Sequence, residues 1–139
     1  MDKIDLVNYR GLAQEVRQLK TQLKTLESAL YSPKGQQFTS TPRATSGPKK
    51  TMEDAVVGHM RLDALYREKL AEQEATLYNL EKAVSTLEDP AQRMVIRERY
   101  FTGLSWRRII ANFAALGYSE RQVYRLHGYA LLKLKEVEL

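Results

Sequence analysis

Residues Trp106 to Leu134, WRRIIANFAALGYSERQVYRLHGYALLKL, decide the fold of this chain. Apolar side chains recur at three- and four-residue spacing on both sides of the corner Gly117-Tyr118-Ser119, which predicts two amphipathic helices. Gly117 can end the first helix in a left-handed conformation because it has no Cβ. Ser119 can cap the second helix, and Gln122 stands where a capping box requires it. The stretch therefore predicts a helix-turn-helix.

A third helix is expected directly before this motif. Asp89 suits the N-cap, Pro90 suits the first helical position, and Gln92 stands at the capping-box position. Residues 89–139 then form a compact tri-helical domain, in which Trp106 either caps the core or packs against the preceding helix. The inward-facing positions predict this core: Met94, Val95, Tyr100, Phe101, Leu104, Ile109, Ile110, Phe113, Leu116, Val123, Leu126, Ala130 and Leu134.

Two long helices, residues 1–31 and residues 51–88, precede this domain. Each carries a narrow heptad seam, which suits a coiled coil or a helical hairpin and needs a partner helix, in the same chain or in another. The first seam is Tyr9, Leu12, Val16, Leu19, Leu23, Leu26 and Leu30. The second is Val56, His59, Asp63, Tyr66, Leu70, Gln73, Leu77, Leu80, Val84 and Leu87. Its polar members, His59, Asp63 and Gln73, can specify one pairing register.

The stretch between the long helices, residues 32–50, has a different composition. It contains three of the four prolines and almost no apolar side chains, so we expect a flexible linker. The predicted fold class is therefore all-α. Its order is an N-terminal heptad helix (1–31), a linker (32–50), a second long helix (51–88) and a helix-turn-helix domain (89–139).

The net charge of +5 lies entirely on the C-terminal part of the chain. Residues 90–139 hold nine of the 22 Lys and Arg but only four of the 17 Asp and Glu. A basic surface on a fold that presents a helix is typical of duplex binding, although solvated helix faces have the same composition. The chain has no Cys and no apolar run of roughly 20 residues, so we expect neither disulfides nor a membrane span. A cytoplasmic location fits this composition.

The exposed first turns of the second helix in a helix-turn-helix enter the major groove of DNA. Arg121 and Arg125, one turn apart, are candidates for bidentate contacts with guanine, and Gln122 suits adenine. Glu120 is exposed on the same turn. Four more residues are candidates for phosphate contacts that position the helix without reading sequence: Arg107, Arg108, Ser119 and Tyr124.

The run from Met94 to Leu134, MVIRERYFTGLSWRRIIANFAALGYSERQVYRLHGYALLKL, resembles region 4 of the sigma-70 family. With Trp106, Tyr118-Ser119, the long helices and the proline-containing linker, the whole chain is similar to small phage and prophage regulators of the ArpU type. The resemblance implies a regulator of phage late genes in a bacterial host cell. It would act by binding double-stranded DNA at a promoter or by recruiting host RNA polymerase, as a homodimer joined through the long helices.

The sequence departs from the sigma pattern in two respects. Glu120 and Tyr124 stand where region 4 often has basic residues, so the recognised site is not expected to be a housekeeping promoter element. No stretch of the sequence resembles the aromatic-rich region 2 with which sigma factors melt promoter DNA. A complete sigma factor is therefore disfavoured.

Other functions remain open. Small terminase subunits of phages also join a helix-turn-helix to oligomerising helices, and a closed ring of eight to ten copies would favour that reading over the regulator. A protein-binding adaptor would show no salt-dependent DNA binding. His59, with only Asp63 near it in sequence, predicts no metal site, and no nucleophile or carboxylate pair has a setting that indicates an enzyme. We expect no cofactor.

Overall fold

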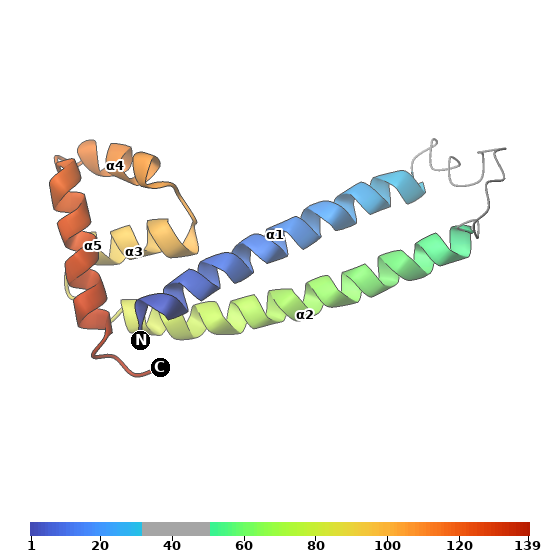
Figure 1. Cartoon of the computed structure of the whole chain (residues 1–139), viewed down its shortest axis with the longest axis horizontal. Helices are drawn as coiled ribbons and strands as arrows, with labels where there is room; N and C mark the ends of the chain where they lie inside the picture. Colours follow the sequence, from blue (N-terminus) through green and yellow to red (C-terminus); the bar gives the residue numbers. More distant parts are fainter. Residues whose placement is uncertain (32–50) are drawn as a thin grey trace. The chain divides into compact units, whose positions relative to one another are not determined.

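The computed structural model describes residues 1–31 and 51–139, and all regular structure in these two ranges is helical. Two long helices come first and a set of short ones follows (Figure 1). The elements are α1 (Lys3–Tyr31), α2 (Met52–Val84), α3 (Pro90–Ile96), the π-helical turn η2 (Arg97–Phe101), α4 (Trp106–Ala114) and α5 (Glu120–Leu134). The expected linker, residues 32–50, lies outside the described residues. The predicted all-α class is confirmed.

The chain packs as two compact units whose boundaries cut across the long helices. The first unit is Met1–Gln14 together with Glu72–Leu139, and the second is Glu15–Ala71. The sequence predicted a separate C-terminal domain at residues 89–139. In the structure, the start of α1 and the end of α2 belong to the same packing unit as those residues.

The core of the first unit explains this grouping. Leu6, Tyr9 and Ala13 of α1 are buried in one apolar cluster with Leu80 and Val84 of α2. The same cluster continues into the C-terminal helices through these buried side chains: Val95, Ile96, Tyr100, Ile109, Phe113, Val123, Ala130 and Leu134. Because a small helical set has little area to bury by itself, the first turns of α1 supply a substantial part of its core.

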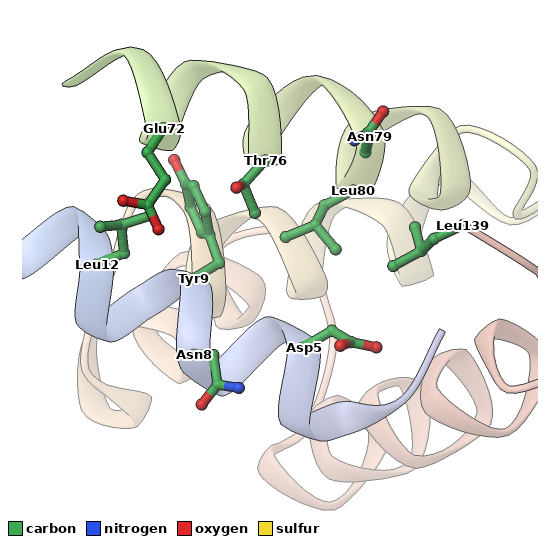
Figure 2. A pocket seen from close by; sticks show the side chains of 9 residues that line it. All are labelled: Asp5, Asn8, Tyr9, Leu12, Glu72, Thr76, Asn79, Leu80 and Leu139. Carbon is green, nitrogen blue, oxygen red and sulfur yellow. The ribbon is translucent and has the colours of Figure 1, made fainter. Parts of the chain in front are cut away.

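Contacts around Tyr9 join three parts of this unit. Its ring meets Phe101 edge-on, with the centroids 5.6 Å apart. Its hydroxyl oxygen accepts a hydrogen bond of 3.3 Å from the side-chain amide of Gln73 on α2. Figure 2 shows Tyr9 reaching from α1 towards α2, while Leu80 points from α2 back towards α1. The polar seam residue Gln73 is therefore used in helix pairing, as its position in the heptad suggested.

In the second unit, the rest of α1 lies beside the start of α2 (Figure 1). Leu19, Leu23 and Leu30 are buried within a single chain, so α2 covers the seam that the sequence left in need of a partner. His59 Nε2 lies 3.1 Å from Glu27 Oε1 across the pair. The sequence left open a coiled coil or a helical hairpin, and the structure contains the hairpin.

The second seam differs from the prediction at two positions. Val56 is 39% exposed and Ala55 is buried in its place, so the seam at the start of α2 is displaced by one residue. The carboxylate of Asp63 accepts a hydrogen bond of 2.9 Å from Nε of Arg67 on its own helix. A carboxylate paired with an i+4 arginine is satisfied locally, so it does not set the register.

Two expectations for the C-terminal helices are wrong, and one core residue was missed. Leu116 is 60% exposed, because the helix has already ended at Ala114 and the corner turns its side chain outward. Gln92 is buried and its Oε1 has no hydrogen-bond partner, so it does not complete a capping box at Asp89. Ile96, absent from the predicted core, is fully buried.

The shared core predicts the effect of shortening one side chain at the start of α1. Leu6→Ala should lower the free energy of unfolding of the first unit by about 2–5 kcal/mol, because it removes buried methyl groups and leaves a cavity. Trp106, the only tryptophan, reports on this unit by its fluorescence during urea unfolding. Ile4→Ala is the matched control, since Ile4 is 63% exposed, and should change stability by no more than about 0.5 kcal/mol. A Trp106 transition unaffected by Leu6→Ala would contradict the shared core.

Candidate nucleic-acid interface

The corner between α4 and α5 is fixed by local hydrogen bonds. Gly117 has a φ of 89°, the left-handed conformation expected of it. The hydroxyl of Ser119 accepts from the main-chain N–H of Gln122 at 3.2 Å, and Gln122 Oε1 accepts from the N–H of Ser119 at 2.7 Å. This reciprocal pair is the predicted capping box, and it defines where α5 begins.

The buried faces of the two helices set which residues can meet a ligand. Ile109 and Phe113 of α4, with Val123 of α5, are fully buried and hold the helices together. All eight candidate residues are exposed: Arg107, Arg108, Ser119, Glu120, Arg121, Gln122, Tyr124 and Arg125. Six of them lie on the corner and the first two turns of α5, and the other two lie on the first turn of α4.

The four arginines of this set carry charge that the described part of the chain leaves unpaired. Neither Arg121 nor Arg125 on α5, nor Arg107 nor Arg108 on α4, has a carboxylate partner among residues 1–31 and 51–139. The arginines before α4 differ. Arg97 bonds to Glu81 and Arg93 to main-chain carbonyls, so their donors are already engaged.

The capping box limits what Gln122 can contact. A bidentate contact with adenine uses both the oxygen and the nitrogen of a side-chain amide. Oε1 of Gln122 already accepts from Ser119, so one of its two lone pairs is used in the cap, whereas its Nε2 hydrogens are not. Ser119 is engaged in the same way through its hydroxyl. These two residues position α5, and the guanidinium groups of Arg121 and Arg125 take no part in the cap.

An aromatic cluster around Trp106, whose placement the sequence left ambiguous, borders this surface. Trp106 stacks at a tilt on Tyr124, with centroids 5.2 Å apart, and meets His127 edge-on at 4.8 Å. The guanidinium of Arg99 lies over the Trp106 ring, 4.9 Å from its centroid. Trp106 therefore packs against both η2 and α5, and Tyr124, 46% exposed, extends the cluster to the surface. The sequence signal was the single Trp at the start of α4.

His127 is an uncharged member of this cluster at neutral pH. Burial, and then the positive charges of Lys3 and Arg99, lower the pKa of His127 from 6.5 to about 4. A neutral ring can accept a hydrogen bond from the Tyr100 hydroxyl, whose oxygen lies 2.8 Å from Nε2. Burial raises the pKa of Tyr100, which keeps this donor protonated. His127 thus supports the interface by packing and adds no charge to it.

The described residues hold no group of three or more His, Asp or Glu side chains that could bind a metal ion. Within the same ranges, no helix is both long enough and apolar enough to cross a membrane. No protein-family model, curated protein or solved structure matches the chain.

The environment of His127 predicts a pH dependence of stability. The folded state binds the His127 proton more weakly than the unfolded chain, so its contribution is complete above pH 6.5 and is lost as the pH falls towards 4. We expect His127 to contribute about 1–2 kcal/mol to the free energy of unfolding. This is roughly half of the free energy that corresponds to the whole pKa shift, because the ring is partly open to solvent. The measurement is urea unfolding between pH 7.5 and 4.

His127→Gln is the control for this measurement, because its side chain does not titrate. The loss of stability between pH 6.5 and 4 should be smaller in this variant by that amount. Equal pH profiles for the two proteins would contradict the assignment.

Proposed function

We propose that this protein binds double-stranded DNA sequence-specifically through α4 and α5, as a transcriptional regulator of phage genes. One observation carries the proposal. α5 buries one face in the core and presents Arg121 and Arg125, one turn apart and without carboxylate partners in the described ranges, on its exposed face. Two helices joined by a capped corner are the arrangement that a helix-turn-helix uses in the major groove.

Arg121 and Arg125 are the base-reading residues in this proposal. A guanidinium offers two parallel donors to the O6 and N7 acceptors of guanine, and this pairing discriminates among base pairs. An arginine that is already paired with a carboxylate of its own chain would have to give up that ion pair to make both hydrogen bonds to guanine. The absence of an ion pair at either arginine among the described residues therefore favours it.

Arg107 and Arg108 are the positioning residues. They lie on the first turn of α4, where a guanidinium can reach a phosphate beside the groove. The capping box at Ser119 fixes the angle at which α5 leaves the corner, so phosphate contacts made from α4 set the register of α5 on the duplex. Tyr124 and Glu120 border the same surface.

Gly128 lies farther along α5. A Cβ placed there would meet no atom within 4 Å, so packing inside the chain does not require glycine at this position. Glycine in a helix interior costs roughly 1 kcal/mol relative to alanine. An outside surface that approaches the α5 backbone closely, such as DNA, gives a reason for this residue.

The wider biological role rests on the resemblance to sigma region 4 and to ArpU-type regulators. In that role the protein acts at a late promoter and contacts host RNA polymerase. A homodimer is part of the proposal, although the heptad seams no longer require one because α1 and α2 cover each other. The surface it would use includes the exposed apolar side chains of Met52, Val57 and Met60 on α2.

Single arginine substitutions test the division between reading and positioning. Arg121→Ala or Arg125→Ala should lower discrimination between a selected site and random duplex by about 1–3 kcal/mol. Arg107→Ala should weaken binding to both duplexes alike and lower the slope of log affinity against log salt by about 1. The site is first obtained by sequencing fragments that the purified protein selects, and affinities are then measured by gel shift at several salt concentrations.

Arg61→Ala is the matched control, since Arg61 is exposed on α2 and belongs to the other packing unit. It should leave affinity for both duplexes unchanged. Equal losses on selected and random DNA for all three interface variants would contradict the proposed reading residues. Binding that is absent or independent of salt would contradict DNA binding itself.

A further inference from the structure

A second basic feature of the first unit is a cavity of about 410 Å³ that no part of the proposed function uses. Four elements line it. α1 contributes Lys3 and Arg10, η2 contributes Arg99 and Tyr100, α4 contributes Trp106, and α5 contributes His127. The cavity is large enough for a small ligand, and its aromatic wall belongs to the cluster described above.

The charge of this cavity has one sign. Lys3, Arg10 and Arg99 line it, and none of its lining residues is acidic. In residues 1–31 and 51–139, no carboxylate forms an ion pair with these three side chains. The cavity shown in Figure 2 differs, because Asp5 and Glu72 are among its lining residues. Like charges held around one space raise the free energy of the folded chain unless an anion enters.

The polar atoms of the cavity have donor capacity to spare. Arg10 Nε is buried and has no hydrogen-bond partner, which is costly for a charged group. Arg99 makes one hydrogen bond, from Nη1 to the carbonyl oxygen of Leu104 at 3.2 Å, and has further N–H groups. Burial, followed by the charge of Arg10, lowers the pKa of Arg99, so the two guanidinium groups act on one another.

We propose that this cavity, which Trp106 also lines, binds a phosphate group held by Lys3, Arg10 and Arg99. Three cationic side chains from two helical elements match an oxyanion that accepts hydrogen bonds from several directions, and arginine pairs well with phosphate. The group belongs either to a free phosphorylated small molecule or to the DNA backbone. The site rests on its own lining residues and does not depend on sequence reading by α5.

The test is the thermal unfolding of the full chain with three probes at pH 7.5 and matched ionic strength: sodium phosphate, adenosine monophosphate and a short duplex. Sodium chloride is the reference. A ligand at about ten times its Kd should raise Tm by roughly 3–6 °C, because it binds only the folded state. Arg10→Gln should abolish this rise. Arg17→Gln, an exposed arginine of α1 outside the cavity, should retain it.

The three probes separate the sources of the phosphate group. A rise with inorganic phosphate or the mononucleotide that Arg10→Gln removes supports a free ligand. A rise with duplex alone that Arg10→Gln reduces supports a backbone phosphate. A rise equal to that in chloride, or one that Arg10→Gln retains, overturns the site. If the protein does not bind DNA, sodium phosphate and adenosine monophosphate still test the phosphate site.

Lys3→Gln provides a second variant in case Arg10→Gln does not fold. Lys3 is exposed at the start of α1, so its substitution should leave the core intact. The phosphate-dependent rise in Tm should fall to less than half of its original size in this variant. A full rise in this variant would overturn the site.

Discussion

Leu6, Tyr9 and Ala13 fill a space that the C-terminal helices cannot fill themselves, and the arrangement of the first unit depends on this burial. The helices after Pro90 are short, and their apolar side chains cover one another only in part. The first turns of α1 and the last turns of α2 close the core from the remaining side. More than half of the chain, residues 1–14 and 72–139, belongs to the unit that holds α4 and α5.

This support has a consequence for the proposed function. An interface that reads base pairs needs its side chains on elements that do not shift when DNA binds. Ile109, Phe113 and Val123 fix α4 against α5, and the capping box fixes the corner between them. α1 also brings Lys3 and Arg10 to Arg99 and Trp106, beside the surface of α5. The same packing that stabilises the helices thus gathers basic side chains from distant parts of the sequence.

The local features of the fold could be predicted because their causes lie within a few residues. Ser119, Gln122 and Gly117 specify the corner by capping and backbone conformation alone. The heptad spacing likewise predicted both long helices, although Ala55 replaces Val56 in the seam. Periodicity places a residue on a face but does not say which element covers that face. The sharing of the core between α1 and the C-terminal helices, and the cavity around Arg10, followed only from the tertiary structure.

Hydrogen exchange of the intact protein tests the shared core most directly, because it measures opening free energy residue by residue. If the first turns of α1 belong to the same cooperative unit as the C-terminal helices, the slowest amides of residues 6–13 open with the same free energy as those of Phe113 and Val123. Exchange at residues 6–13 that is much faster than at Phe113 and Val123 would contradict this account.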